Sequence, residues 1–183
     1  MELSCPLCTM PEIKSPMQHT SQIARLLHDE HMEEVAVLER LEGALQKQKS
    51  TTPPATDDSF MTGILIDLIG NTDTQINQHF VFEETFLFPK LAECGEVGIG
   101  MVLASEHQAI RETGTAVIAL ARAARENGFN ADSWHQFHQL AGELIEWVIS
   151  HVQKEEMALL PLIEDILDEK ADGDLAQSYM ASR

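Results

Sequence analysis

The sequence predicts an all-α protein that folds as an antiparallel up-down-up-down four-helix bundle. Three observations support this fold class. Long stretches are rich in Leu, Ile, Ala and Met, few segments alternate between apolar and polar residues, and one pair of helical patterns recurs along the chain. The 183 residues, of which 44% are hydrophobic and 23% charged, suit one globular domain with a sizeable core.

Capping and turn signals divide the chain into four long helices. Ser15 and Pro16 are typical of a helix start, and the stretch STTPPATDD is a linker between the first and second helices. Gly70-Asn71 predicts a kink or a break within the second helix, and Gly128 suits the end of the third. The predicted helices cover residues 15–49, 57–92, 99–126 and 132–167.

The chain divides into an N-terminal segment (residues 1–15), the bundle (residues 16–170) and a polar C-terminal tail (residues 171–183), which we expect to be partly frayed. The N-terminal segment contains Cys5 and Cys8 in the motif CPLC. Three hypotheses fit this motif: half of a zinc site completed by a second copy in a homodimer, a redox dithiol, or an exposed unstructured terminus.

The charge and hydropathy patterns exclude several classes of partner. The net charge is −18, whereas nucleic acids and anionic membranes bind basic surfaces, so we expect neither as a partner. No apolar run approaches the roughly 20 residues of a membrane span, and the start of the chain lacks the features of a signal peptide. Together with an odd number of cysteines, this predicts a cytoplasmic protein.

The chain repeats a helix-pair pattern. The segment HFVFEETFLFP, which begins at His79, aligns with HVQKEEMALLP, which begins at His151. The preceding helices also correspond, because DEHMEEV around His31 resembles SEHQAIR around His107. The sequence therefore predicts two copies of one helical hairpin, related by a pseudo-two-fold axis. Pro89 and Pro161 occupy equivalent positions, and we expect each to end or bend its helix.

Helical geometry gives this repeat a chemical meaning. Residues i and i+4 lie only about 40° apart around a helix, so His79 shares a face with Glu83, and His151 with Glu155. Apolar neighbours place these faces toward the bundle axis, where an isolated carboxylate would be costly. Two metal ions bridged by both glutamates would satisfy them, and mixed imidazole and carboxylate ligands suit iron better than manganese or zinc. The predicted ligands are His31, His79, Glu83, His107, His151 and Glu155.

Some neighbouring residues remain alternatives. His28 precedes His31 by one turn and could replace it or support it from behind, and Glu156 is a minor alternative to Glu155. Otherwise Glu84 and Glu156 point away from their histidines and are expected in surface or interhelix pairs. Three further histidines lie too far along the helices to join the site: His19, His135 and His138.

The motifs DEHMEEVAVLERLE, HFVFEETFLFP, SEHQAIRE and HVQKEEMALLP resemble the hemerythrin-like (HHE cation-binding) domain family over roughly residues 20–165. The resemblance implies a four-helix bundle that holds two iron ions, bridged by carboxylates and an oxo or hydroxo group, with the same six ligands. Oxygen-carrying members have a second histidine one turn after the histidine of the third helix. Here that position is Arg111, which argues against simple reversible oxygen transport and could instead pair with an acidic residue.

The resemblance leaves three functional hypotheses. The first is a di-iron protein that binds a small diatomic ligand, O2 or NO, for sensing, scavenging or storage. The second is a di-iron oxidoreductase, or a factor that repairs iron–sulfur centres under nitrosative or oxidative stress. The third is an iron-responsive regulatory module that acts through a partner.

Overall fold

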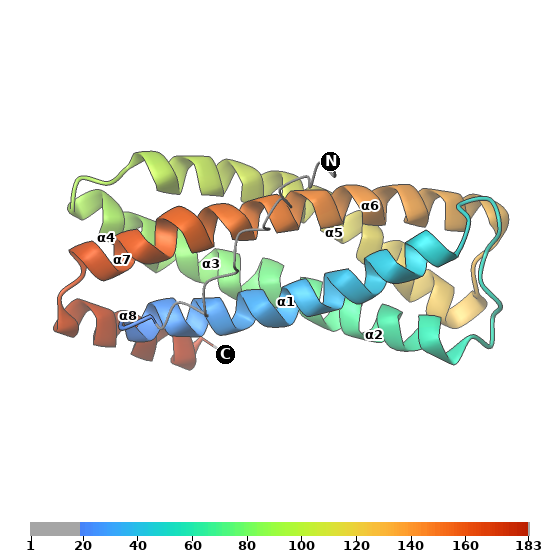
Figure 1. Cartoon of the computed structure of the whole chain (residues 1–183), viewed down its shortest axis with the longest axis horizontal. Coiled ribbons are helices and arrows are strands. Elements are labelled where there is room, and N and C mark those ends of the chain that lie inside the picture. Colours follow the sequence, from blue (N-terminus) through green and yellow to red (C-terminus); the bar gives the residue numbers. More distant parts are fainter. Residues whose placement is uncertain (1–18, 183) are drawn as a thin grey trace, which may run out of the picture.

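The computed structural model describes residues 19–182, and these residues form helices joined by short loops, without strands. Four long helical stretches, each called a rod below, lie side by side and alternate in direction, as the sequence predicted (Figure 1). The first rod is α1 (Gln22–Lys47), and the third is α5 (Gly98–Asn127). The second and fourth rods are interrupted. The second comprises α2 (Ser59–Thr74), η1 (Gln75–His79), α3 (Phe80–Phe82), η2 (Glu83–Leu87) and α4 (Phe88–Glu93), and the fourth comprises α6 (Ala131–Lys154), η3 (Glu155–Leu159) and α7 (Leu160–Ile166).

Side chains cap the N-terminal ends of three of the four rods. The hydroxyl of Ser21 accepts a hydrogen bond from the amide of Ala24, so the described part of α1 starts later than the predicted Ser15, which lies outside the described residues. Asp58 caps α2, and Asn130 forms a reciprocal capping box at the start of α6. At the end of α5, Gly128 adopts a φ of 72°, a conformation that L side chains rarely adopt.

Each proline of the repeat is preceded by a π-helical turn, and neither ends its helix. In η2 the amide of Phe88 bonds to the carbonyl of Glu83, five residues back, and the next residue is Pro89. The equivalent turn η3 precedes Pro161 in the same way. A wider turn tolerates a residue that lacks an N–H and would crowd the preceding turn. Of the two predicted effects, an end or a bend of the helix, the end is therefore wrong, because α4 and α7 continue beyond Pro89 and Pro161.

The irregularity predicted at Gly70-Asn71 occurs further along the chain. Helix α2 runs through this pair to Thr74, and the first π-helical segment begins at Gln75. Gly70 has no neighbouring atom close to where a side chain would begin, so its small size answers no local packing requirement.

The polar tail is a fifth helix rather than a frayed end. Helix α8 (Glu169–Ala181) begins at the cap Asp168 and folds back along α1 (Figure 1). It buries Leu175, Ala176 and Tyr179, and Asp172 accepts hydrogen bonds from the start of α1. The expectation of a frayed tail was wrong because the apolar residues of this segment, spaced three to four apart, bury one face among many exposed polar residues.

Two apolar clusters fill the bundle, one on each side of a polar layer. In α1, Ile23 and Leu27 belong to one cluster and Leu38 and Leu41 to the other, with His31 between them. Helix α5 shows the same order, with its own histidine between the clusters. The histidines therefore lie within the packed interior of the bundle. Within the described residues, no helix is both long and apolar enough to cross a bilayer.

Candidate metal centre

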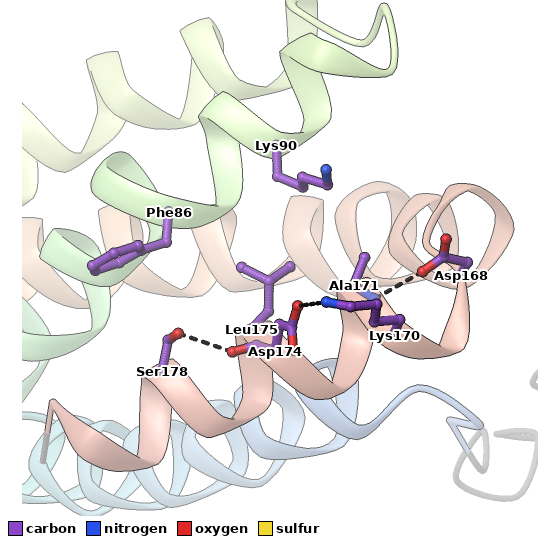
Figure 2. A pocket seen from close by; sticks show the side chains of 8 residues that line it. All are labelled: Phe86, Lys90, Asp168, Lys170, Ala171, Asp174, Leu175 and Ser178. Carbon is purple, nitrogen blue, oxygen red and sulfur yellow. Dashed lines mark hydrogen bonds and ion pairs between the residues drawn. The ribbon is translucent and has the colours of Figure 1, made fainter.

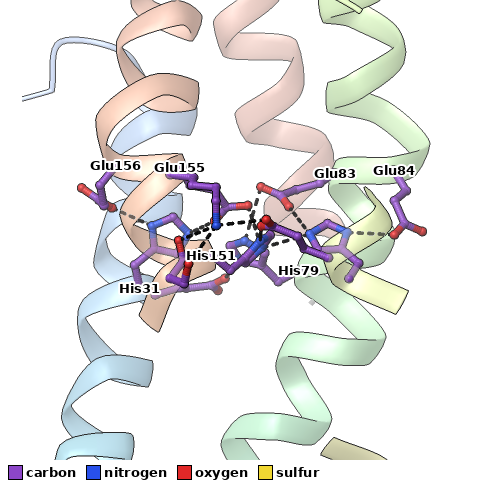
Figure 3. Close-up of polar contacts among 12 residues, drawn as sticks. His31, His79, Glu83, Glu84, His151, Glu155 and Glu156 are labelled. Carbon is purple, nitrogen blue, oxygen red and sulfur yellow. Dashed lines mark hydrogen bonds and ion pairs between the residues drawn. The ribbon is translucent and has the colours of Figure 1, made fainter. Parts of the chain in front are cut away.

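The six residues predicted from the repeat converge in the middle of the bundle (Figure 3). α1 and α5 each supply one histidine, and the second and fourth rods each supply a histidine and a glutamate. All six side chains are at most 2% exposed. They are His31, His79, Glu83, His107, His151 and Glu155.

Each central glutamate contacts one histidine from each hairpin. Glu83 lies 3.4 Å from Nε2 of His79 and 3.3 Å from Nε2 of His107. Glu155 lies 2.8 Å from Nε2 of His31 and 3.0 Å from Nε2 of His151. All four Nε2 atoms therefore face the two carboxylates, and the two carboxylates join the hairpins.

These atoms form two overlapping groups that could each hold a cation. One group contains Glu83, His107, His151 and Glu155, and the other contains His31, His79 and Glu155, with the candidate ligand atoms of each group within 4.8 Å of one another. Glu155 is common to both groups. The geometry therefore offers two adjacent cation positions with a shared carboxylate.

The central oxygens fit a bound cation. Both carboxylate oxygens of Glu83, both of Glu155 and the Nε2 atom of His31 are buried without a hydrogen-bond partner among the described residues. Leaving so many buried polar atoms unsatisfied is costly, and a cation that all of them contact would remove that cost. Nitrogen and oxygen donors of this kind suit iron, zinc or manganese.

A second set of glutamates orients the histidines by contacting their Nδ1 atoms, on the side of each ring that faces away from the central carboxylates. An ionised carboxylate only accepts hydrogen bonds, so each imidazole donates its Nδ1–H outward and directs Nε2 inward. Figure 3 shows Glu84 and Glu156 on the outer sides of the cluster. The Nδ1 distances are 2.6 Å from His31 to Glu156, 2.9 Å from His79 to Glu30, 2.8 Å from His107 to Glu84 and 3.0 Å from His151 to Glu106.

The role of these four outer glutamates was not predicted, although the amino-acid sequence contains a signal for it. Two of them directly precede a histidine of α1 or α5, in the dipeptide Glu-His, and two directly follow a central glutamate, in Glu-Glu. Glu84 and Glu156 were predicted in surface or interhelix pairs, and both do make interhelix pairs. What periodicity could not indicate is that their partners are the inward-facing histidines.

Each outer glutamate contacts a further donor besides its histidine. Nζ of Lys154 lies 2.9 Å from Glu106, Nη1 of Arg111 lies 2.8 Å from Glu84, and Nδ1 of His28 lies 2.9 Å from Glu156. The hydroxyl of Tyr179, on α8, donates a hydrogen bond to Glu30. The cluster is therefore built in three layers, which are the central glutamates, the histidines and the outer glutamates, and each outer glutamate is held by one further donor.

The structure shows the contacts of the residues that the sequence left as alternatives. His28 contacts Glu156 rather than the central group, and Glu156 contacts the outer nitrogen of His31. Arg111 pairs with Glu84, which is one of the pairings that the sequence allowed. His135 is exposed and His138 contacts the carbonyl of Leu45, both away from the cluster.

Burial and charge compete in setting the protonation of the site. Burial disfavours the imidazolium of His31, but the carboxylates of Glu155 and Glu156 outweigh it and raise the pKa of His31 to about 9. For His79, burial is likewise outweighed, chiefly by Glu83, and the pKa rises to about 9. Burial also disfavours the carboxylate of Glu155, yet His151 and His31 hold its pKa well below the usual range. Protons therefore occupy the metal-free site and must leave when a cation binds.

A separate surface pocket lies between α4 and α8 and has no connection to this chemistry (Figure 2). Its polar groups have partners within their own helices: Lys170 pairs with Asp174, the hydroxyl of Ser178 bonds to the carbonyl of Asp174, and Lys90 pairs with Glu93. None of its lining residues belongs to the histidine–glutamate cluster: Phe86, Lys90, Asp168, Lys170, Ala171, Asp174, Leu175 and Ser178.

The fold and the cluster together define a helical-bundle protein with a buried candidate site for cations. The family model described as the hemerythrin HHE cation-binding domain matches residues 22–163. The chain therefore belongs to the hemerythrin HHE cation-binding domain family, and the resemblance noted from the motifs is confirmed. The match ends before α8, which follows the family domain. No curated protein matches the chain.

Proposed function

We propose that this protein is a non-haem di-iron protein that binds a small diatomic ligand, O2 or NO, for sensing, scavenging or storage. Two iron ions would occupy the two overlapping groups of side chains and share the central carboxylates. The proposed ligands are His31, His79, Glu83, His107, His151 and Glu155. Iron bound here would supply redox chemistry and open coordination positions.

One observation carries this proposal above all. The buried oxygens of Glu83 and Glu155 face four imidazole nitrogens and have no hydrogen-bond partner among the described residues. The count of donors also matters. Two histidines and two shared carboxylates give each ion four protein ligands, and a bridging oxo or hydroxo group would be the fifth. An ion that favours six ligands would then keep one position for a small molecule.

An apolar surface pocket near the cluster is further evidence for a small, weakly polar ligand. It is lined by Phe88, Pro89, Val97 and Met101 and reaches Glu84, whose carboxylate accepts the Nδ1–H of His107. A diatomic gas partitions into apolar surroundings more readily than a charged substrate does. The pocket therefore extends as far as the outer glutamate that contacts His107.

Metal analysis combined with optical spectroscopy tests the proposal. The iron-loaded chain should contain about two irons and show charge-transfer bands that change with O2, NO or azide. His79→Gln and His151→Gln should each remove the bands, whereas the exposed His135→Gln is the matched control and should keep them. A purified chain that binds no iron, or whose bands ignore all three ligands, would contradict the proposal.

A buried acid favours a second candidate function, a di-iron oxidoreductase. Glu34 lies one turn after His31 in α1 and is only 4% exposed. Burial raises the pKa of its carboxyl to about 7, although His79 and His31 oppose the shift. Reduction of peroxide or NO consumes protons as well as electrons, and a buried acid with a pKa near neutrality suits proton delivery.

Glu34→Gln separates the two candidates because glutamine keeps the shape of the side chain and cannot donate the same proton. If the protein is an oxidoreductase, this variant should lose steady-state turnover of peroxide or NO by at least about tenfold while it keeps its iron. Unchanged turnover, or no turnover in the parent chain, would leave ligand binding as the function.

A further inference from the structure

A second group of potential metal ligands lies outside the central cluster. His19, just before α1, and His28, on α1, come together with Glu156 of η3. The ring centroids of the two histidines are 5.3 Å apart, and Nδ1 of His28 lies 2.9 Å from Glu156. We predicted from the sequence that His19 lies too far from His31 to join the central site. In the structure His19 lies beside His28.

His19 is a buried histidine whose polar atoms are unsatisfied. It is 5% exposed, and neither ring nitrogen has a hydrogen-bond partner among the described residues. Its nearest acid is Glu164, 3.5 Å from Nδ1, which is too long for a hydrogen bond. A buried imidazole normally bonds through at least one nitrogen, so this arrangement indicates a missing partner.

The donor set has the composition of a transition-metal site. One ligand atom each from His19, His28 and Glu156 lie within 4.8 Å of one another. Ligand atoms about 2 Å from a tetrahedral zinc ion lie roughly 3.3 Å apart, so small side-chain rotations would bring all three into contact with one ion. Two imidazoles and a carboxylate suit zinc or ferrous iron, whereas calcium and magnesium prefer oxygen ligands.

We propose that His19, His28 and Glu156 form a third cation site, selective for a divalent transition metal, that shares Glu156 with the central cluster. The side chains of His28 and Glu156 are 23% and 20% exposed, so an ion can reach this site from solvent. The proposal does not depend on which metal occupies the centre.

Glu156 couples the outer site to the centre. One of its oxygens accepts the Nδ1–H of His31 at 2.6 Å, and the other lies 2.9 Å from His28. A cation bound by this carboxylate withdraws charge from it and weakens its hold on the His31 imidazole. Occupation of the outer site therefore alters the ligand strength of His31, the central histidine that Glu156 contacts.

Zinc stoichiometry tests the site. The full-length chain, loaded with iron and then titrated with Zn²⁺, should bind one more ion per chain than either His19→Gln or His28→Gln. Metal content is measured by mass spectrometry after desalting, and far-UV circular dichroism verifies that each variant folds. His28 is partly exposed, so its variant should fold even if the buried His19 proves structurally necessary.

Two controls identify the residues that hold the extra ion. His135→Gln changes an exposed histidine elsewhere and should retain it, as should a chain carrying both Cys5→Ser and Cys8→Ser. Equal zinc content in the parent chain and both site variants overturns the proposal. So does an extra ion that disappears only with the cysteines. If the chain binds no iron, the same comparison of zinc content still decides the outer site.

The coupling has its own readout. Zn²⁺ should shift the optical bands of the iron-loaded parent chain and leave those of His28→Gln unchanged. Identical zinc-induced shifts in both proteins would show that the outer site does not act through Glu156.

Discussion

The two helical hairpins, residues 22–93 and 98–166, are alike at the centre of the molecule and different around it. Each contributes two histidines and one central glutamate at equivalent positions, and each outer glutamate contacts the Nδ1 atom of a histidine. The donors behind those outer glutamates do not correspond between the hairpins. The inner atoms must satisfy a common geometry, whereas an outer glutamate needs only a hydrogen-bond donor from some direction.

The clearest difference lies three residues after the second histidine of each hairpin. The second hairpin has Lys154 there, and its ammonium pairs with Glu106. The first hairpin has Phe82, which has no polar group, and the equivalent glutamate is Glu30. Tyr179 of α8 supplies the donor instead, and its ring packs on Phe82 at 4.5 Å. Helix α8 thus performs for the first hairpin what a lysine performs for the second.

The other two outer donors come from opposite directions. In the second hairpin, Arg111 lies one turn after His107 and bonds to Glu84. In the first, His28 lies one turn before His31 and contacts Glu156. The position that would match Arg111 is Val35, so the first hairpin has no donor there. The same requirement is therefore met by different residues on different turns.

The largest expected effect tests the symmetry of the centre. Glu83→Gln and Glu155→Gln should each lower metal affinity by more than about 100-fold, because each carboxylate contacts histidines of both hairpins. Metal content after dialysis measures this loss, and the exposed Glu146→Gln is the matched control. Loss of only one ion in either variant would mean that the central carboxylates do not bridge the two positions.

The metal-free protein should show a stability that falls at high pH. The pKa values of His31 and His79 are about 9 in the folded chain, against about 6.5 when unfolded. Their stabilisation is therefore complete below about pH 6.5 and is lost as pH rises through about 9, by about 3 kcal/mol for each histidine. Chemical denaturation at several pH values measures it, and His31→Gln should flatten the profile. A free energy of unfolding that rises over this range would contradict the assigned charge states.

Substitutions of Tyr179 and Lys154, the donors to Glu30 and Glu106, should have smaller effects and allow the two donors to be compared. Tyr179→Phe removes a buried hydrogen bond to Glu30 and should cost about 1–3 kcal/mol of stability, because the donor serves a buried carboxylate. Thermal unfolding of the metal-free and metal-loaded chains measures the cost. If Tyr179 only fills space beside Phe82, this variant should unfold like the parent chain.

The smallest effect on stability is expected from a change of Lys154, which is the donor in the second hairpin that corresponds to Tyr179. Lys154→Met removes an ion pair whose lysine side chain is 40% exposed, and solvent screens such pairs. The change in stability should be at most about 0.5 kcal/mol in the same thermal assay. A cost equal to that of Tyr179→Phe would remove the distinction between a buried and a solvent-screened donor.

Much of the centre was predictable because it follows from local helical geometry. The spacing of His79 and Glu83, repeated as His151 and Glu155, placed each pair on one helix face. Apolar neighbours then showed that these faces point inward. The positions of Pro89 and Pro161 were also correctly singled out, but a π-helical turn absorbs each proline, and turn type depends on packing that single-residue propensities do not describe.

The amino-acid sequence by itself determined the helical fold, the repeat and the six residues that converge, because periodicity specifies which side chains share a face. Only the tertiary structure decided which atoms meet across helices. It paired the outer glutamates with Nδ1 atoms, brought His19 beside His28, and docked α8 so that Tyr179 reaches Glu30. These contacts join residues far apart in sequence, and their partners depend on how rods rotate and pack against one another. Helical periodicity does not specify that arrangement.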